Sequence, residues 1–276
     1  MSAPGPLAGR TAVVTGSTRG VGRACALALA QAGANVVVTG KSVTERERLP
    51  GTIQSVAAEL EAAAPGVGVL AQRCDVRQPD QIEALVDATL ARFGAIDIWV
   101  NNAGAAWWHP VEETPARRFD LVMDVNFRGP HEAARLILPH MRAQGSGHIV
   151  NMSPPVHRPD MVGGKAAYMV SKFGMTYLAI ALAEELAGEP IAVNALWPVT
   201  LIESYATINL GLGERAQWRR PEILADALVA MVRQDPSALG SGRAWLDEEA
   251  LRELEGVEDF SAYACVSGET PLTIPW

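Results

Sequence analysis

The sequence predicts an α/β protein built on one doubly wound parallel sheet with helices on both faces. Two features of the 276-residue chain carry this prediction. Six short runs of apolar and β-branched residues recur along it, and such continuous runs are typical of strands buried on both faces. A longer segment with helical periodicity joins each run to the next, which is the alternation of a parallel βαβ sheet.

The strands follow from the apolar runs. They are predicted at residues 11–15 (TAVVT), 35–39 (NVVVT), 67–71, 96–100 (IDIWV), 148–152 (HIVNM) and 191–196 (IAVNAL). Helices are predicted between them at residues 22–32, 52–63, 79–93, 115–141 (one helix or two) and 164–186. Gly33 can end the first helix in the left-handed conformation, and Pro79 suits the first turn of the third. This order of elements is that of a Rossmann-like sheet.

Residues 199–220 and 245–276 depart from this alternation. The first stretch follows the sixth strand, so we expect it to cover the carboxyl edge of the sheet as a short lid. A peripheral helix pair without a gating role is the alternative. The second stretch holds an acidic helical segment and an apolar end (TPLTIPW), which can pack onto the same domain or onto a partner subunit. Since no linker or repeat divides the chain, residues 1–276 are predicted to form a single domain.

Composition argues against several classes of function. A formal net charge of −8 without a basic face argues against nucleic acid as a partner. The apolar runs are far shorter than the roughly 20 residues of a membrane span, and the N-terminus lacks the pattern of a signal peptide. The three cysteines are widely spaced and form neither a disulfide framework nor a metal-ligand pattern. We therefore expect no metal, no membrane contact and a cytoplasmic location.

A glycine-rich loop directly follows the first strand and opens the first helix. Gly16 permits the tight turn, Gly20 lets backbone N–H groups approach a pyrophosphate, and Gly22 allows close packing of the helix on the sheet. Glycine clusters also serve ordinary turns, but the place between strand and helix N-terminus favours phosphate binding. The residues expected to bind the cofactor here are Gly16, Ser17, Arg19, Gly20, Val21 and Gly22.

The end of the second strand selects the nucleotide. An acidic residue at this place binds the ribose 2′-hydroxyl of NAD and repels a 2′-phosphate. Here the strand runs into TGKS (39–42), which offers Lys41 and no carboxylate, and Arg19 is expected nearby. Two cations favour a 2′-phosphate, so NADP(H) is predicted rather than NAD(H). The alternative is that Lys41 is only a solvated surface lysine.

Tyr168 and Lys172 stand four residues apart on a predicted helix and therefore share one helix face. A free tyrosine has a pKa of about 10, too high for efficient acid–base work at neutral pH, and a neighbouring ammonium is expected to lower it. Ser153 follows the fifth strand, where its hydroxyl can hydrogen-bond a substrate oxygen. The Tyr-x-x-x-Lys spacing alone is common by chance, and its combination with Ser153 indicates a proton-transfer site.

These pieces together resemble the short-chain dehydrogenase/reductase family. The resemblance covers nearly the whole chain and rests on TGSTRGVG (15–22), CDV (74–76), NNAG (101–104), VNFRG (125–129), NMSPP (151–155), YMVSK (168–172) and VNALWP (193–198). Within the family, the hydroxysteroid-dehydrogenase-like branch is the most similar, on GKSVTERERLPGTI (40–53), NMSPP, NALWPVT (194–200) and the tail (245–263).

The resemblance implies roles for individual residues. Tyr168 would be the acid/base, Lys172 would bind the nicotinamide ribose and depress the tyrosine pKa, and Ser153 would orient the substrate oxygen. Asn126 would hold a water that links Lys172 to solvent, and Asn101 is open to a purely architectural role. The cofactor would also contact Asp75 and Val76 at its adenine, the loop Asn102, Ala103 and Gly104, and the segment with Pro198 and Thr200.

The segment after the sixth strand departs from the family pattern. The family usually places glycine after the proline, whereas Val199 follows Pro198 here. The threonine expected a few residues on, to contact the cofactor, is Glu203 in this chain. Thr200 and Ser204 flank it and are the candidates to replace it.

We therefore expect an oxidoreductase that reduces a carbonyl, or oxidises a secondary alcohol, of a hydrophobic small molecule. NADPH would deliver hydride while Tyr168 gives a proton to the oxygen and Ser153 stabilises the oxyanion. The substrate pocket is expected to be aromatic. Its candidate residues are Trp107, Trp108, Pro154 and Trp197, with Trp218 in the lid and His109 and His157 as polar contacts.

The alternative function is an NADP(H)-binding sensor or scaffold that turns over no substrate. The complete set of Asn126, Ser153, Tyr168 and Lys172 disfavours it, because a protein without turnover would not need all four catalytic residues. By the family resemblance we expect a homo-oligomer, either a dimer or a tetramer. The helix at residues 164–187 is expected among its contacts.

Overall fold

A computed structural model describes residues 4–45, 50–156 and 163–274 of the chain. At its centre lies a seven-stranded, wholly parallel sheet in the order β3-β2-β1-β4-β5-β6-β9. The strands are β1 (Thr11–Thr15), β2 (Asn35–Gly40), β3 (Val69–Arg73), β4 (Ile98–Asn101), β5 (Gly147–Met152), β6 (Ile191–Trp197) and β9 (Ala244–Leu246). The predicted fold class is confirmed, and β9 is a strand that the sequence did not predict.

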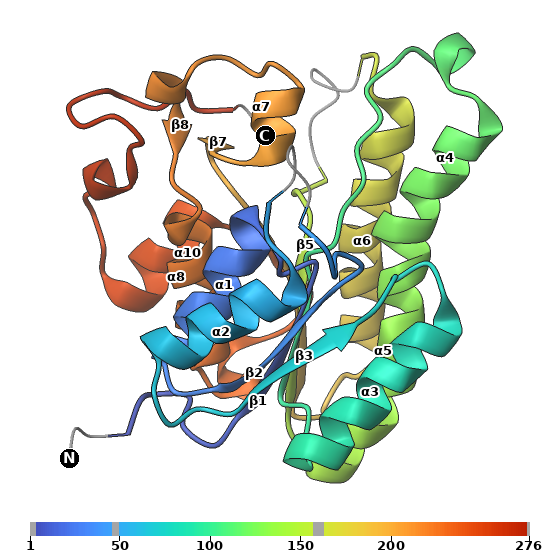
Figure 1. The fold of residues 1–276 in the computed structure, drawn as a ribbon, viewed down its shortest axis with the longest axis vertical. Helices are drawn as coiled ribbons and strands as arrows, with labels where there is room; N and C mark the ends of the chain where they lie inside the picture. The colour runs from blue at the N-terminus through green and yellow to red at the C-terminus, as the bar shows by residue number, and fades with distance from the viewer. Residues whose placement is uncertain (1–3, 46–49, 157–162, 275–276) are drawn as a thin grey trace.

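Helices cover both faces of the sheet (Figure 1). One face carries α1 (Gly20–Gln31), α2 (Ile53–Ala63), α8 (Glu222–Val232) and α10 (Asp247–Glu255). The other carries α3 (Pro79–Phe93), α5 (Gly129–Gln144) and α6 (Ala166–Glu185). The predicted stretch 115–141 holds α4 (Ala116–Met123) and α5, joined by the π-helical segment η2 (Asp124–Arg128). Shorter helical turns lie at η1 (Val111–Glu113), α9 (Pro236–Leu239) and η4 (Ser261–Tyr263).

Each face of the sheet packs against its own buried core. In β1 and β2, Val14 and Val36 belong to the core under α1 and α8, whereas Val13 and Val37 belong to the core under α3 and α5. Successive strand residues point to opposite faces, and both faces are covered here. Apolar residues are therefore favoured on both faces of each strand, which explains the apolar runs in the sequence.

The predicted lid forms a small layer of its own at one end of the sheet (Figure 1). It contains β7 (Leu201–Ile202), α7 (Tyr205–Asn209), η3 (Arg215–Gln217) and β8 (Trp218–Arg219), with β7 and β8 paired in parallel. The C-terminal tail returns to this layer, because Thr273 pairs with Thr200 and the Ile274 N–H donates to the Val199 carbonyl at 2.8 Å. The tail is expected to pack onto the same domain or onto a partner subunit, and in the structure it packs onto its own chain.

By length and composition, α6 is long and apolar enough to cross a membrane, and it is the single such helix in the described part of the chain. Met175, Ala179 and Leu182 on one side of α6 are buried, and the helix packs on β5 and β6. A core helix of this kind passes the same test of length and composition. Its other side leaves Val170 and Tyr177 exposed.

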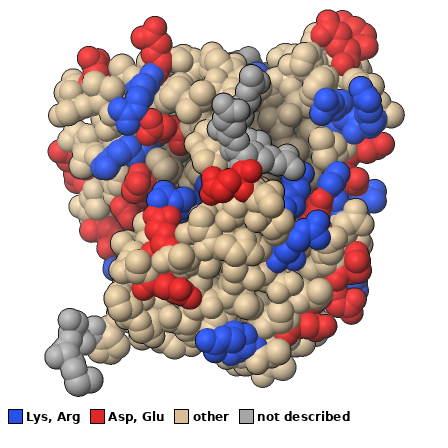
Figure 2. Space-filling view, in the orientation of Figure 1, with Lys and Arg blue, Asp and Glu red and all other residues tan. Residues whose placement is uncertain are grey.

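The surface and the cysteines carry little further chemistry. Basic and acidic side chains are interspersed on the face shown in Figure 2. Cys25 and Cys74 are buried thiols and Cys265 is a half-buried one, all three free. Within residues 4–45, 50–156 and 163–274, no group of three His, Cys, Asp or Glu side chains could hold a metal ion.

Candidate active site

The glycine loop after β1 is built so that no side chain fits at two of its positions. Gly16 has φ +68°, and a Cβ there would lie 2.9 Å from Ala103 Cα. A Cβ on Gly22 would lie 2.3 Å from Asn102 Nδ2 and 2.5 Å from the Gly16 carbonyl oxygen. Asn102 Nδ2 itself donates to the Thr15 and Gly16 carbonyls at 2.8 and 3.2 Å. The loop is therefore fixed against the end of β4 with its backbone close to the sheet.

Ser17, which is predicted to bind the cofactor, does not line the cavity beside this loop. Its side chain is fully buried and its Oγ accepts the Thr39 N–H at 2.9 Å. The Ser17 N–H in turn donates to the Thr39 carbonyl at 3.0 Å. Ser17 thus fastens the glycine loop to the end of β2, and its hydroxyl is already used.

The end of β2 brings two cations together, as predicted. Arg19 Nη2 donates to Ser42 Oγ at 2.8 Å and to the Gly51 carbonyl at 3.2 Å, and Lys41 is exposed beside them. The nearby Asp75 carboxylate accepts two hydrogen bonds from the Arg77 guanidinium, at 2.9 and 2.5 Å. These bonds hold the pKa of Asp75 below its ordinary value and neutralise its charge locally.

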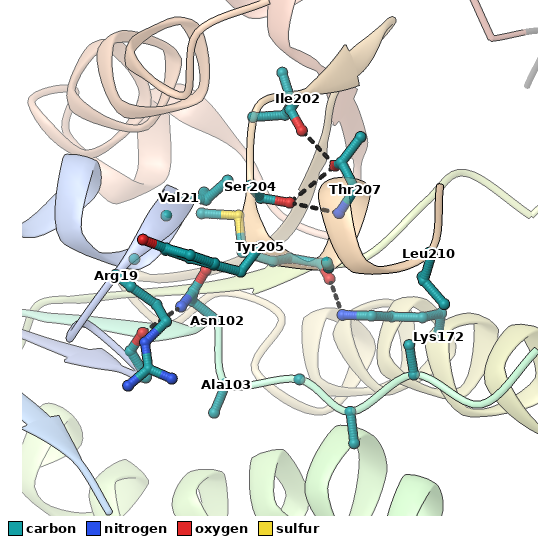
Figure 3. A pocket seen from close by; sticks show the side chains of 18 of the residues that line it. Arg19, Val21, Asn102, Ala103, Lys172, Ile202, Ser204, Tyr205, Thr207 and Leu210 are labelled. Carbon is teal, nitrogen blue, oxygen red and sulfur yellow. Dashed lines mark hydrogen bonds between the residues drawn. The ribbon is translucent and has the colours of Figure 1, made fainter. Parts of the chain in front are cut away.

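One cavity of about 950 Å³ extends from this cationic end to Tyr168. Figure 3 shows part of it, with Arg19 and Lys172 among the lining residues. The predicted residues that line it are Gly16, Arg19, Gly20, Val21, Gly22, Lys41, Asp75, Val76, Asn102, Ala103, Gly104, Trp108, Tyr168, Lys172, Trp197, Pro198 and Thr200. The predicted residues that lie off its wall are Ser17, Trp107, His109, Asn126, Ser153, Pro154 and Trp218. The cavity therefore joins the expected cofactor and chemical ends into one site.

Tyr168 and Lys172 both face this cavity from α6, but their ionisation differs from the prediction. Burial raises the pKa of Tyr168, and burial lowers the pKa of Lys172 to about 7. Lys172 Nζ donates to the Met152 carbonyl at 2.7 Å and lies 5.4 Å from the centroid of the Trp197 ring. The prediction that the ammonium lowers the tyrosine pKa is not met here, because removal from water favours the uncharged form of both groups.

Asn126 lies at the centre of the π-helical segment η2 and is completely buried. Its amide exchanges hydrogen bonds with the Ala105 backbone, at 2.7 and 2.9 Å, and donates to Ser171 Oγ at 2.9 Å. A Cβ built on Gly104 would be 3.7 Å from Asn126 Oδ1 and 3.9 Å from Lys172 Nζ. Asn126 therefore fixes the loop after β4 close to Lys172. Asn101 is architectural, since its side chain bonds those of Asn151 and Trp99.

Ser153 is the clearest difference from the expected site. It is fully buried, and its Oγ accepts a hydrogen bond from Thr176 Oγ1 at 2.8 Å. Thr176 Oγ1 is also 2.7 Å from the carbonyl oxygen of the next residue, Pro154, which is buried as well. The Ser153 hydroxyl thus bonds a residue of α6 and does not line the cavity.

Of the four expected tryptophans, Trp108 and Trp197 line the cavity. The Trp108 ring meets Tyr168 edge-on with 5.8 Å between centroids. Trp107 points elsewhere, stacked on His109 at 4.2 Å and under the Arg118 guanidinium at 4.6 Å. Trp218 is buried inside the lid layer, where its Nε1 donates to the Leu212 carbonyl at 2.7 Å. His157 lies outside the described residues.

The lid layer and the tail supply the rest of the wall, which sequence reasoning did not identify residue by residue. Figure 3 shows Ser204, Tyr205 and Thr207 over the cavity, opposite Asn102 and Lys172. Further lining residues from this region are Leu201, Ile202, Ala206, Leu210, Gly211, Leu212, Gly213, Leu272, Thr273 and Ile274. The one sequence feature that these residues share is their position after β6, the last long strand.

Within the lid, Ser204 is a lining residue and Glu203 is not. Ser204 Oγ accepts the Thr207 N–H at 3.1 Å, which begins α7. Glu203 instead forms an ion pair with Arg215 at 2.5 Å. Thr200 and Ser204 are therefore the hydroxyl side chains available at the place where the family pattern expects a threonine.

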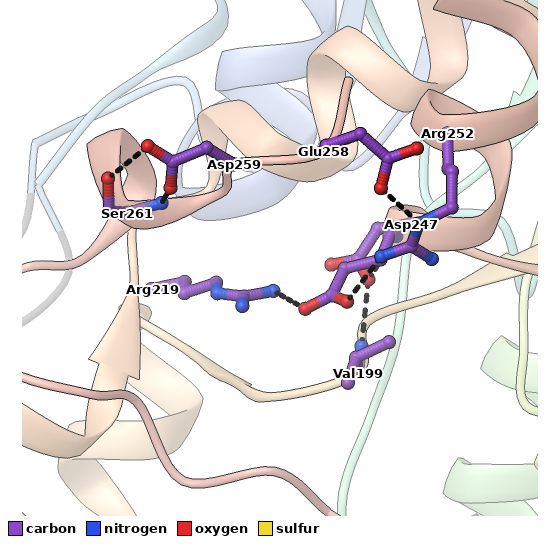
Figure 4. Close-up of polar contacts among 8 residues, drawn as sticks. Val199, Arg219, Asp247, Arg252, Glu258, Asp259 and Ser261 are labelled. Carbon is purple, nitrogen blue, oxygen red and sulfur yellow. Dashed lines mark hydrogen bonds and ion pairs between the residues drawn. The ribbon is translucent and has the colours of Figure 1, made fainter. Parts of the chain in front are cut away.

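Asp247, at the start of α10, holds the turn between Pro198 and Thr200 (Figure 4). The side chain is completely buried, and Oδ1 accepts the Val199 and Glu248 N–H groups at 2.9 and 2.8 Å. Oδ2 has no hydrogen-bond partner among the described residues. Burial raises the pKa of Asp247 to about 6, although Arg219 acts in the opposite direction. This buried carboxyl is one that sequence reasoning missed.

Comparisons with known proteins agree with this geometry. The family described as short chain dehydrogenase matches residues 10–207. Hydroxysteroid dehydrogenase-like protein 2 of Danio rerio is 42% identical over 270 residues, which cover 97% of this chain and 64% of the relative. The chain thus spans less than two thirds of the length of that protein.

Solved structures of a dehydrogenase and of a short-chain oxidoreductase are also similar to this chain. A putative dehydrogenase from Xanthomonas campestris superposes with a TM-score of 0.92 at 40% identity, covering 97% of both chains. A metagenomic short-chain oxidoreductase in complex with NADP superposes with a TM-score of 0.72 at 30% identity, covering 87% of this chain and 98% of the other.

Proposed function

The chain belongs to the short-chain dehydrogenase family, and we propose that it is an NADP(H)-dependent oxidoreductase that interconverts a carbonyl and an alcohol. The predicted resemblance to the hydroxysteroid-dehydrogenase-like branch is confirmed by relatives of that name. The observation that carries the proposal is the single cavity that joins the cations after β2 to Tyr168 and Lys172.

The walls of the cavity fit a dinucleotide with a 2′-phosphate. The glycine loop leaves no room for side chains, so backbone N–H groups can approach a pyrophosphate. Arg19, Lys41 and Ser42 surround the end of β2, and the one carboxylate among the described lining residues, Asp75, is paired with Arg77. Such a site attracts a phosphate dianion and offers no acceptor carboxylate for the 2′-hydroxyl of NAD. The NADP found in the metagenomic relative supports the same choice.

Tyr168 is the proton donor in the proposed reaction. When bound, the nicotinamide supplies the hydride. Because burial raises its pKa, Tyr168 stays protonated at neutral pH and can give its proton to the oxygen of a carbonyl. Lys172 lies one turn further along α6, and with a pKa of about 7 it both holds and releases a proton near neutrality.

The remaining groups position these two. Lys172 is oriented by the Met152 carbonyl at 2.7 Å, and Asn126 fixes the neighbouring loop through Ala105. Trp108 packs against the Tyr168 ring, so a substrate carbonyl would reach the hydroxyl past an aromatic wall. With Ser153 turned inward, the proposal gives it no contact with substrate.

Titration of the pure protein with NADPH and NADH, followed by tryptophan fluorescence, tests the cofactor. We expect tighter binding of NADPH, and Arg19→Ala should remove that preference while NADH binding changes little. Equal affinities in the unchanged protein would refute the NADP(H) assignment.

Tyr168→Phe tests the chemistry: carbonyl reduction should be lost while NADPH affinity is kept. Turnover at a near-normal rate by this variant would show that Tyr168 is not the donor.

We also propose that the protein is a homo-oligomer that uses the outer side of α6. Val170 and Tyr177 of α6 and Phe119 of the adjacent α4 are exposed apolar side chains. Sedimentation velocity should show a dimer or tetramer, and Tyr177→Glu should shift it toward the monomer. A monomeric unchanged protein would refute the proposed oligomer.

The alternative function, an NADP(H)-binding sensor or scaffold, is disfavoured, because Tyr168 and Lys172 share a substrate-sized cavity.

A further inference from the structure

Lysine is rare in this chain and is confined to one place. It occurs at positions 41, 165 and 172, whereas the other 20 of the 23 basic residues are arginines. All three lysines line the cavity. Lys41 lies at the proposed 2′-phosphate end, and Lys172 bonds the Met152 carbonyl beside Tyr168. The proposed function therefore leaves Lys165 as the one lysine without a role.

Lys165 lies at the chemical end of the cavity. It directly precedes α6, three residues before Tyr168. Its Nζ lies 4.5 Å from the centroid of the Trp108 ring, and the same ring contacts Tyr168 at 5.8 Å between centroids. The Lys165 ammonium and the proton donor thus contact the same aromatic side chain.

The Lys165 ammonium has no counter-charge in the described part of the chain. No ion pair or hydrogen bond joins its Nζ to a described residue, and its contact is with the Trp108 ring. Asp75 is the one carboxylate among the described lining residues, and it is paired with Arg77 at the other end of the cavity. A half-buried cation beside an apolar wall is stabilised more by an anion than by a ring alone.

Much of the rest of the wall is apolar. It includes side chains from α4, η2, the lid layer and the tail, namely Leu121, Val125, Leu210, Leu212, Leu272 and Ile274. A ligand that fits this surface has an apolar body, and one that also satisfies Lys165 has a negative charge near its carbonyl.

We propose that Lys165 binds an anionic group of the substrate, so that the substrate is an apolar carbonyl compound bearing a carboxylate or a phosphate ester. The inference rests on the proposed function, since it names the substrate class of that site. Lys165 would act on substrate affinity, as a compact point charge that Trp108 holds in place.

The test compares an aliphatic oxo acid with its methyl ester, which keeps the chain and the carbonyl but removes the charge. Binding is measured by calorimetry on the protein loaded with NADP⁺, a combination in which both partners are oxidised and no turnover occurs. The acid is expected to bind about 10- to 100-fold more tightly than the ester, the size of one hydrogen bond to a charged group. An oxoalkyl phosphate of the same length is the third probe, and the tighter of the two anions identifies the group.

Lys165→Met keeps the length of the side chain and removes the charge. In this variant the acid should bind no more tightly than the ester. Arg117→Met is the matched control, because Arg117 is an exposed cation on α4 that does not line the cavity, and it should keep the preference. Equal binding of acid and ester by the unchanged protein, or a preference that survives in Lys165→Met, would overturn the proposal.

Turnover separates this proposal from the proposed function. Reduction of acid and ester by NADPH at equal kcat/KM would leave the oxidoreductase intact and overturn the anion site. Tight, Lys165-dependent binding of the acid without turnover of either compound would support the anion site and refute the oxidoreductase.

Discussion

Replacing the buried Asp247 by asparagine should change how the stability of the fold depends on pH. Burial raises the pKa of this carboxyl from 3.8 to about 6 in the folded protein. A raised carboxyl pKa stabilises the fold at low pH, and that contribution is lost as the pH rises through the folded-state pKa. Each pKa unit corresponds to about 1.4 kcal/mol, so this one residue lowers the free energy of unfolding by about 2–3 kcal/mol between about pH 4 and pH 7.

Asparagine at position 247 would keep the hydrogen bonds of Oδ1 and replace Oδ2 by an amide group. Its carbonyl oxygen can still accept the Val199 and Glu248 N–H groups, so the turn beside the cavity stays in place. Its amide group would take the position of Oδ2, which has no hydrogen-bond partner among the described residues. An unsatisfied buried amide costs about 1–3 kcal/mol, but it does so at every pH. The pH dependence therefore isolates the ionisation of Asp247 from the cost of the amide.

The assay is equilibrium urea unfolding of both proteins across this pH range, followed by far-UV circular dichroism. Asp247→Asn should gain stability relative to the unchanged protein as the pH rises. Asp259→Asn is a control of opposite sign, because hydrogen bonds from Ser261 lower the pKa of the exposed Asp259 carboxyl. That variant should lose relative stability as the pH rises. Parallel stability curves for Asp247→Asn and the unchanged protein would refute the reasoning.

Three further predictions follow from the site. Ser153→Ala should lower the free energy of unfolding by about 1 kcal/mol, through the bond to Thr176, and leave kcat/KM for carbonyl reduction nearly unchanged. A loss of activity of about 100-fold would instead return Ser153 to the catalytic set. Gly22→Ala should weaken NADPH binding and lower the melting temperature, because its Cβ would collide with Asn102 Nδ2, and normal affinity would contradict this. Because the pKa of Tyr168 is raised, steady-state reduction should not decline between about pH 7 and pH 9, whereas alcohol oxidation should rise, and a fall in reduction over that range would show a donor of lower pKa.

The parts of the fold that the sequence predicts well are those whose burial is decided locally. The runs at β1, β2 and β6 are rich in apolar residues and buried at most positions, because the sheet is covered on both faces. β9 has the same covered environment but only three residues, Ala244–Leu246. A run of that length carries no periodicity, and its place beside β6 depends on where α8 and α9 return the chain.

The site residues too are predictable from the sequence where their placement is decided locally, and not where it depends on distant residues. Tyr168 and Lys172 are related by one helical turn, so their common direction follows from spacing alone. The direction of Ser153 depends on Thr176, a residue 23 positions away, and on how the chain turns after β5. The pKa of Tyr168 also depends on distant residues, because burial by the whole cavity wall outweighs the single ammonium that the sequence brings near.

The three lysines show how a sequence signal gains meaning from structure. Their rarity is visible in the composition, yet rarity alone suits a chain that simply uses arginine for its surface ion pairs. Arginine is the better partner for bidentate pairing with carboxylates, and Arg23, Arg142 and Arg243 pair in this way with glutamates at the surface. Lysine offers a compact charge on a flexible stem, which suits contact with a ligand that arrives and leaves. Because the fold gathers all three lysines around one cavity, chance placement on the surface is a poor account of them, and a cofactor phosphate at one end with an anionic substrate at the other is a better one.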